Sequence, residues 1–303
     1  MKVIVTLPLF AFSIIVGFAQ TPEWVEYCRL KKTTQSELVT SDTIYKTYCV
    51  MDSIYNGIPL FTDLFQFLKA AIACDEQEKI KELAFRIVRW KCWDCRLFEQ
   101  PDLVWIKQKD YWPQLDTLSL LNCKKSNFTD YMRELYMLKL SDQQCRISLH
   151  DALSKEEVDS VWTIIHFTDS QNLEKLKDLI NHYGFPTWEK VGYDYALCAW
   201  IIAQHADSAF LHEYVEQLKK AVANDNANPK NLAYMIDRDL MNQNLPQLYG
   251  TQSIAMLNSD GVMEDMLWPV ENIDQLNARR EHMLLAPMDT VGVKIYDLQI
   301  FRQ

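Results

Sequence analysis

Apolar side chains recur every three or four residues along most of this chain, which is the spacing that gives an α-helix one buried face. The repeat is clearest over residues 61–72, 80–88, 128–138, 158–165, 173–180 and 210–222. The polar residues Asp169, Ser170 and Asn172 are expected to interrupt one of these helices. The pattern contains no regular alternation of strands and helices, so the sequence predicts a mainly α-helical fold.

One stretch, residues 193–207, departs from this amphipathic pattern. Residues 196–203 are apolar without a break, and a helix that is apolar all round cannot lie on a surface. We therefore predict a buried central helix with other helices around it. The stretch ends in Gln204, His205 and Asp207, which places polar side chains at the end of a buried rod.

One small β-hairpin is expected towards the C-terminus. Residues 253–257 and 262–268 carry strand-like residues and flank the sequence Asn-Ser-Asp-Gly at positions 258–261. This composition is typical of a turn between two antiparallel strands.

In this interpretation the chain divides into two helical parts. Residues 20–118 form an N-terminal helical array, in which the segment 101–115 resembles the closing segment of tetratricopeptide-like arrays without their usual consensus. Residues 120–303 form a second α-helical domain with the central helix and the hairpin. The boundary is expected within residues 117–127, where periodic signals are few.

The first residues have the layout of a secretory signal peptide, which we assign to residues 1–19. Lys2 precedes an uncharged run, and the small residues Gly17 and Ala19 occupy the −3 and −1 positions of a cleavage site. A membrane anchor is the alternative, but the run is short and lacks a basic stop. No later segment reaches spanning length, so we expect a periplasmic or secreted protein without a membrane span after cleavage.

The net charge of the chain argues against two classes of partner. The 303 residues carry a formal net charge of −10, and removal of Lys2 with the leader would make it −11. The sequence contains no basic cluster. An acidic chain of this kind is not expected to bind nucleic acid or an anionic membrane surface.

Eight cysteines are present, and export would permit disulfides between them. Most of them lie in helical patterns and are expected to be buried thiols. Cys198 in particular is predicted to be buried and unpaired, because its neighbours on every side are apolar. Cys92 and Cys95 share a helix face, where a structural cystine or two reduced thiols is expected. A redox pair would need a thioredoxin-like βαβ context.

Several motifs of the second half resemble an uncharacterised bacterial family, domain of unknown function 6624, over about residues 120–296. They are DSQNLEKLKDLINHYGFPT, VG, AQHAD, LAYMIDRD, PQLYGTQ and ARR, in the order of the family. The resemblance implies membership and no particular activity. The matching positions are Asp142, Gln143, Arg146, Asp169, Asn172, Gly184, Pro186, Gly192, Gln204, His205, Asp207, Asp237, Arg238, Gln247, Tyr249, Gly250, Thr251, Gln252, Arg279 and Arg280.

Polar residues of four separate segments form the candidate site. They are Gln204, His205, Asp207, Asp237, Arg238, Gln247, Tyr249, Thr251, Gln252, Arg279 and Arg280. Buried apart from one another, they would leave unsatisfied polar groups at a cost of about 1–3 kcal/mol each. We therefore predict that they converge, with His205 touching a carboxylate or the turn around Gly250.

Each candidate also has a purely structural interpretation. His205 could be a general base, a metal ligand or a cation at a helix C-terminus, and Asp207 could orient it or cap the next helix. Asp237 and Arg238 are about 100° apart on a helix, so only one of them can face a site. Asp142 and Arg146, four residues apart, are expected to pair along a helix.

Two functions remain open at this point. The first is a binding module with a polar pocket for a small polar or anionic ligand or a partner protein. The alternative is a hydrolase that uses His205 with Asp207 or Asp237, with Arg280 and the turn stabilising charge. HExxH, GxSxG, Walker and GxGxxG motifs are absent, and we predict no cofactor and no metal site.

Overall fold

The computed structural model describes residues 21–35, 39–55, 57–90, 97–122, 128–151, 155–257 and 263–297. These residues form eleven α-helices, three short 3-10 helices and a two-stranded antiparallel sheet. The prediction of a mainly α-helical fold with one small hairpin is thereby confirmed. The predicted signal peptide, the pair Cys92 and Cys95, and the hairpin turn at 258–261 lie outside the described residues.

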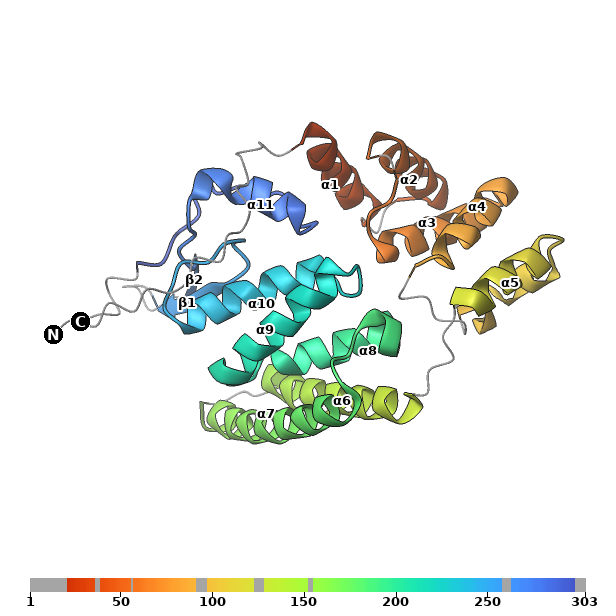
Figure 1. Cartoon of the computed structure of the whole chain (residues 1–303). Coiled ribbons are helices and arrows are strands. Elements are labelled where there is room, and N and C mark those ends of the chain that lie inside the picture. The colour runs from red at the N-terminus through yellow and green to blue at the C-terminus, as the bar shows by residue number, and fades with distance from the viewer. Residues whose placement is uncertain are drawn as a thin grey trace.

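The N-terminal half is an array of helices that pack in chain order (Figure 1). Its elements are α1 (Pro22–Thr34), α2 (Ser41–Ile54), α3 (Phe61–Ala73), α4 (Gln77–Ile87), η1 (Leu97–Glu99), η2 (Val104–Gln108) and α5 (Trp112–Asn122). Thr21 caps α1 as its sequence indicates. Helix α2 is capped by Thr40 and begins at Ser41. Helix α5 continues to Asn122, so the first half of the expected boundary segment is helical.

The second half begins with two long helices that lie side by side (Figure 1). Its elements are α6 (Thr129–Asp151), α7 (Lys155–Tyr183), α8 (Trp188–Ala203), α9 (Ser208–Ala223), α10 (Pro229–Asn242), β1 (Ser253–Leu257), β2 (Met263–Leu267), η3 (Ile273–Gln275) and α11 (Leu276–His282). In the hairpin Ser253 pairs with Leu267 and Leu257 with Met263.

The expected interruption near Asp169 and Asn172 is wrong, because α7 is continuous for 29 residues. Polar side chains break helices when they compete for the backbone of their own turn. Here they find partners on the neighbouring helix instead: Asp169 accepts hydrogen bonds from Arg146, and the buried Asn172 donates to the carbonyl of Leu138. Packing against α6 therefore overrides the local signal.

Helix α8 is the predicted central helix, and it packs against α6, α7 and α9. Its buried positions include Cys198, Ala199 and Ile202, while Trp200 is only half-buried. The helix contains a kink at Gly192, where φ is 81° and ψ is 172°. The segment before Gly192, residues 188–191, is the first turn of this helix.

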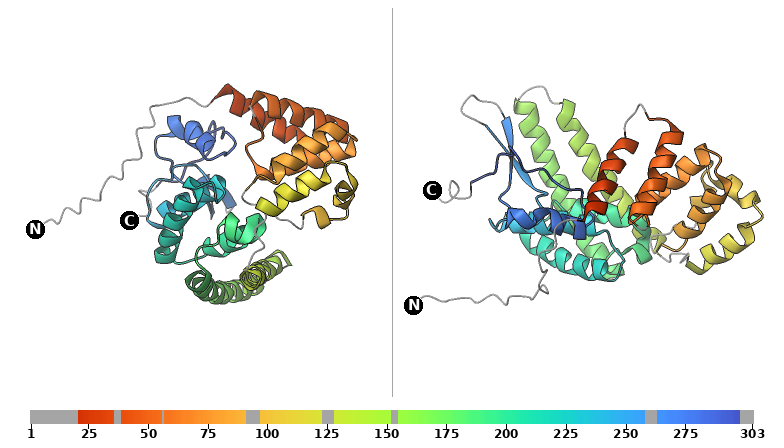
Figure 2. Two further views of the ribbon diagram at one scale, coloured as in Figure 1. Left: turned by 45° about the vertical axis from the view of Figure 1, so that its right-hand side comes forward. Right: turned by 90° about the horizontal axis from the view of Figure 1, so that it is seen from above.

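Helix α11 and the residues just after it lie beside α1 (Figure 2). The indole N–H of Trp24 in α1 donates to the carbonyl oxygen of Leu285 at 2.9 Å, and the backbone N–H of Thr21 donates to Glu281 at 2.7 Å. Leu284 also packs against the hydrophobic core of the N-terminal array. Within the described ranges, no helix combines the length and hydropathy needed to cross a membrane.

Candidate functional site

A buried ionic cluster joins α6 to α7. The guanidinium of Arg146 donates to Asp142, one turn earlier on α6, at 2.8 Å and to both oxygens of Asp169 on α7 at 2.8 and 2.9 Å. The side chain of Asp142 is 1% exposed and also accepts a hydrogen bond from Gln143. The expected pair of Asp142 with Arg146 is present, and a second carboxylate completes it.

His205 lies beside this cluster, just beyond the end of α8. Its Nε2 atom is 3.8 Å from Oδ1 of Asp142, and 31% of its side chain is exposed. Burial and the positive charge of Arg146 lower the pKa of His205, against the opposing effect of Asp142 and Asp169. With a pKa below its usual value of about 6.5, the imidazole is neutral at pH 7.

The carboxylate neighbour of His205 is therefore Asp142, and neither Asp207 nor Asp237 takes that place. Asp207 caps α9 by accepting the backbone N–H of Phe210 at 2.9 Å, and it lies 3.5 Å from Lys177 of α7. Capping explains its position without a role at His205. Gln204, the C-cap residue of α8, makes no side-chain hydrogen bond with the described residues.

Arg238 on α10 is a cation without a counter-charge among the described residues. Its Nε atom is buried without a hydrogen-bond partner, and the side chain forms no ion pair within the described part of the chain. Burial lowers the pKa of this guanidinium. Its positive charge is also among the causes that lower the pKa of His205, so the two side chains lie within electrostatic range of each other.

Asp237, the neighbour of Arg238, points into the protein and anchors the turn around Gly250. Its carboxylate accepts the backbone N–H groups of Leu248, Tyr249 and Thr251 at 2.8 to 3.0 Å, and the hydroxyl of Thr251 at 2.8 Å. Burial raises the pKa of Asp237, while these hydrogen bonds lower it. All of its acceptor capacity is used within the fold.

The two glutamines of the turn are bound to each other. The side chain of Gln247 accepts the backbone N–H of Gln252 at 2.8 Å and donates to the carbonyls of Gln252 and Trp268 at 3.0 and 2.6 Å. Gln247 is fully buried and Gln252 nearly so. Gly250 has φ of 63°, the left-handed conformation that the turn requires.

The arginines of α11 complete this network by holding backbone carbonyls. Arg279 donates to the carbonyls of Leu248, Glu271 and Asn272. Arg280 donates to those of Tyr249 and Ala286. Burial lowers the pKa of both guanidinium groups. The predicted segments thus form two groups: a turn network around Asp237, and a more open group at His205.

Lys230, which no sequence pattern singled out, lies two helical turns before Arg238 on the same face of α10. Burial lowers its pKa to about 8, and Lys31 and Arg280 are nearby cations. Lys31 is paired with Asp63 at 2.6 Å. The Lys230 ammonium has no ion pair with any described residue. The spacing of four residues between positions 230, 234 and 238 could have indicated a shared helix face. Only the folded structure shows that the two charges lack partners among the described residues.

The described residues include two buried free thiols. Cys198 is free and 2% exposed, which confirms its prediction, and burial raises its pKa to about 11. Cys28 is also free and buried, with its pKa raised to about 11. No three His, Cys, Asp or Glu side chains of the described part are grouped as metal ligands.

Comparison with known proteins gives one match. A family model described as a family of unknown function (DUF6624) matches residues 129–298. The matched region contains α6 to α11, and therefore both the His205 group and the turn network. No curated protein and no solved structure matches the chain.

Proposed function

The chain belongs to the family of unknown function DUF6624, and we propose from its geometry that it is a binding protein for a small anionic ligand. The observation that carries this proposal is the unpaired guanidinium of Arg238, within electrostatic range of the neutral imidazole of His205. A partly buried cation without a counter-charge is costly to the folded state. An anion bound there would supply the missing partner.

The contrast between two arginines supports this assignment. Arg146 is saturated by Asp142 and Asp169, so its charge is already balanced within the protein. Arg238 has no such partner among the described residues. Arg146 therefore serves to fix the wall on which His205 rests, while Arg238 is available for a carboxylate or phosphate group, which guanidinium binds with two hydrogen bonds.

One face of α10 carries a second cation besides Arg238. Lys230, Tyr234 and Arg238 are spaced by four residues, so they follow one face of the helix over a rise of about 12 Å. Tyr234 is 39% exposed between the two unpaired cations. A ligand with two anionic groups and an apolar middle is complementary to this face.

We also propose that binding takes place after export, in the cell envelope or outside the cell. The layout of residues 1–19, with Lys2, an apolar run and Ala19 at the cleavage site, supports this location. The acidic net charge of −10 supports a small ligand and not a polyanion such as nucleic acid.

Calorimetric titration of the purified chain with phosphate, citrate and succinate tests the proposal. We expect at least one of these anions to bind and to raise the Tm, and Arg238→Gln to weaken that binding about tenfold or more. Arg133→Gln is the matched control, because Arg133 is 65% exposed on α6. Equal binding by the wild type and Arg238→Gln, or no binding of any anion, would refute the proposal.

A hydrolase is the second candidate, and a specific observation favours it. His205 is neutral at pH 7 and lies 3.8 Å from the buried carboxylate of Asp142, so it could accept a proton from water with Asp142 stabilising the imidazolium. Hydrolysis of p-nitrophenyl acetate and p-nitrophenyl phosphate tests it. Turnover should disappear in His205→Ala and persist in the control His212→Ala, whose side chain is 63% exposed.

A further inference from the structure

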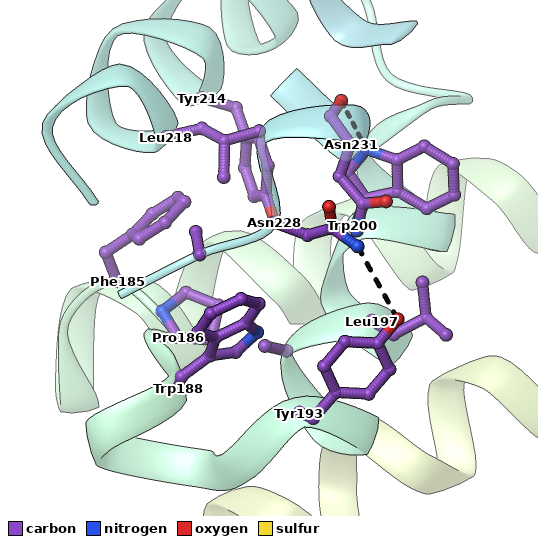
Figure 3. Close-up of a pocket in the computed structure, with 12 residues that line it drawn as sticks. Phe185, Pro186, Trp188, Tyr193, Leu197, Trp200, Tyr214, Leu218, Asn228 and Asn231 are labelled. Carbon is purple, nitrogen blue, oxygen red and sulfur yellow. Dashed lines mark hydrogen bonds between the residues drawn. The ribbon is translucent and has the colours of Figure 1, made fainter. Parts of the chain in front are cut away.

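A hollow lined by aromatic rings lies between α8, α9 and the start of α10 (Figure 3). Its rings belong to Phe185, Trp188, Tyr193, Trp200 and Tyr214. Its enclosed part is small, about 10 Å³, and the roughly 320 Å³ of empty space at its mouth includes open solvent. The polar residues Asn228 and Asn231, from α10 and the residue before it, complete the wall. None of these residues belongs to the anion site proposed above.

The kink at Gly192 sets the position of two of these rings. With φ of 81° and ψ of 172°, this residue occupies a backbone region that is essentially restricted to glycine. The change of direction brings the rings of Trp188 and Tyr193 to 5.8 Å between centroids, at 35° to each other. The two rings, on either side of the kink, therefore line one hollow (Figure 3).

The remaining rings are held in place by the fold. Trp200 donates its indole N–H to the backbone carbonyl of Asn231 at 3.0 Å, and Phe185 packs against Tyr214 at 4.9 Å between ring centroids. A rigid aromatic wall binds with little loss of conformational freedom. The hollow is therefore organised before any ligand arrives.

The polar groups of the hollow are neutral. No Asp, Glu, Lys, Arg or His is among the residues that line it. The side-chain amide of Asn231 makes no hydrogen bond within the described residues. Asn228 accepts the backbone N–H of Lys230 at 3.0 Å, and its amide nitrogen lies 3.5 Å from the hydroxyl of Tyr193. An amide offers both a donor and an acceptor to a ligand.

We propose that the pyranose ring of a neutral sugar binds across the open mouth of this hollow. The C–H faces of such a ring are apolar and pack flat on aromatic rings, which suits Trp188 and Tyr193. Its hydroxyl groups donate and accept hydrogen bonds, as the free amide of Asn231 requires. A charged ligand would lose its solvation without a counter-charge in return. A proline-rich peptide offers acceptors and few donors, so it would leave the amide oxygen of Asn231 without a partner.

Tryptophan fluorescence and calorimetric titration of the full chain with glucose, galactose, N-acetylglucosamine, maltose and cellobiose test the proposal. We expect at least one sugar to bind and to change the fluorescence. Trp188→Ala and Asn231→Leu should each weaken that binding about tenfold. Trp188→Phe keeps a ring in place and should restore part of the affinity.

Two controls establish whether sugar binding belongs to this hollow. Trp162→Ala changes an indole on α7 that is 44% exposed and is not part of the hollow, so sugar binding should be unchanged. Arg238→Gln should likewise leave sugar binding intact, which distinguishes this proposal from that of the anion site. The proposal is overturned if no sugar binds the folded chain, or if Trp188→Ala binds sugar as the wild type does. Binding of a decaproline peptide in place of every sugar also overturns it.

Discussion

The Nε2 atom of His205 lies 3.8 Å from Oδ1 of Asp142, although Asp142 is on α6 and His205 follows the end of α8, 63 positions later in the chain. The contact places a neutral imidazole over a carboxylate that Arg146 already neutralises. The protonation state of His205 therefore depends on four charged neighbours, Asp142, Arg146, Asp169 and Arg238.

This environment predicts how stability changes with acid. Because the folded state lowers the pKa of His205, the unfolded chain binds its proton more readily below about pH 6.5. The contribution of His205 to the free energy of unfolding should thus be lost as the pH falls from 7 to 5, by no more than about 1.4 kcal/mol per pH unit. Urea unfolding of the wild type and His205→Asn over this range measures the difference. A parallel dependence in both proteins would show that His205 is not responsible.

The turn network predicts a large effect of Asp237→Asn. The variant replaces one carboxylate oxygen with an NH₂ group that faces the N–H and hydroxyl donors of Thr251. A buried donor facing other donors should lower the free energy of unfolding by about 2–4 kcal/mol. Asp194→Asn, on an exposed position of α8, is the control and should change it little. Thermal and urea unfolding measure both variants.

The unpaired charge of Lys230 predicts that its replacement by an apolar residue stabilises the protein. Its ammonium is desolvated and unpaired among the described residues, with a pKa of about 8. Lys230→Met should raise the free energy of unfolding at pH 7 by about 1–2 kcal/mol. Between pH 8 and about 10.4 the wild type should gain stability, because only the unfolded chain still binds the proton there. The advantage of the variant should therefore shrink as the pH rises. An advantage that does not depend on pH would point to packing and not to charge.

Gly192→Ala tests the kink of α8. A Cβ atom at this position would meet nothing within 4 Å, so the cost comes from the backbone conformation alone. We expect the free energy of unfolding to fall by about 1–3 kcal/mol. The change should also alter the fluorescence of Trp188 if the kink relaxes. An unchanged Tm would contradict the assigned conformation.

Local features of the fold were predictable from the sequence because they depend on neighbours in the chain. The cap at Thr21, the hairpin strands and the burial of Cys198 all follow from residue type and periodicity. The continuity of α7 did not follow, because the partners of Asp169 lie on another helix.

Contacts between distant segments, which the sequence does not show, are even more important in the candidate site. The sequence pointed to His205 with Asp207 or Asp237, because it did not show which carboxylate would lie next to the imidazole. How α6 packs against the end of α8 decides that Asp142 is the partner instead. Packing likewise decides that the Asp237 carboxylate accepts all its hydrogen bonds from the turn around Gly250. It also decides that the Nε atom of Arg238 has no partner among the described residues.

The contact between α1 and residues 281–286 changes which helices of the N-terminal array should unfold first. In an open helical array the terminal units have a single neighbour, so they fray first and exchange their amide hydrogens fastest. Here α1 is bounded by α2 on one side and by Glu281 and Leu285 on the other. Its amides should therefore exchange as slowly as those of interior helices. A chain shortened by its last few segments would lose that protection at the opposite end of the sequence.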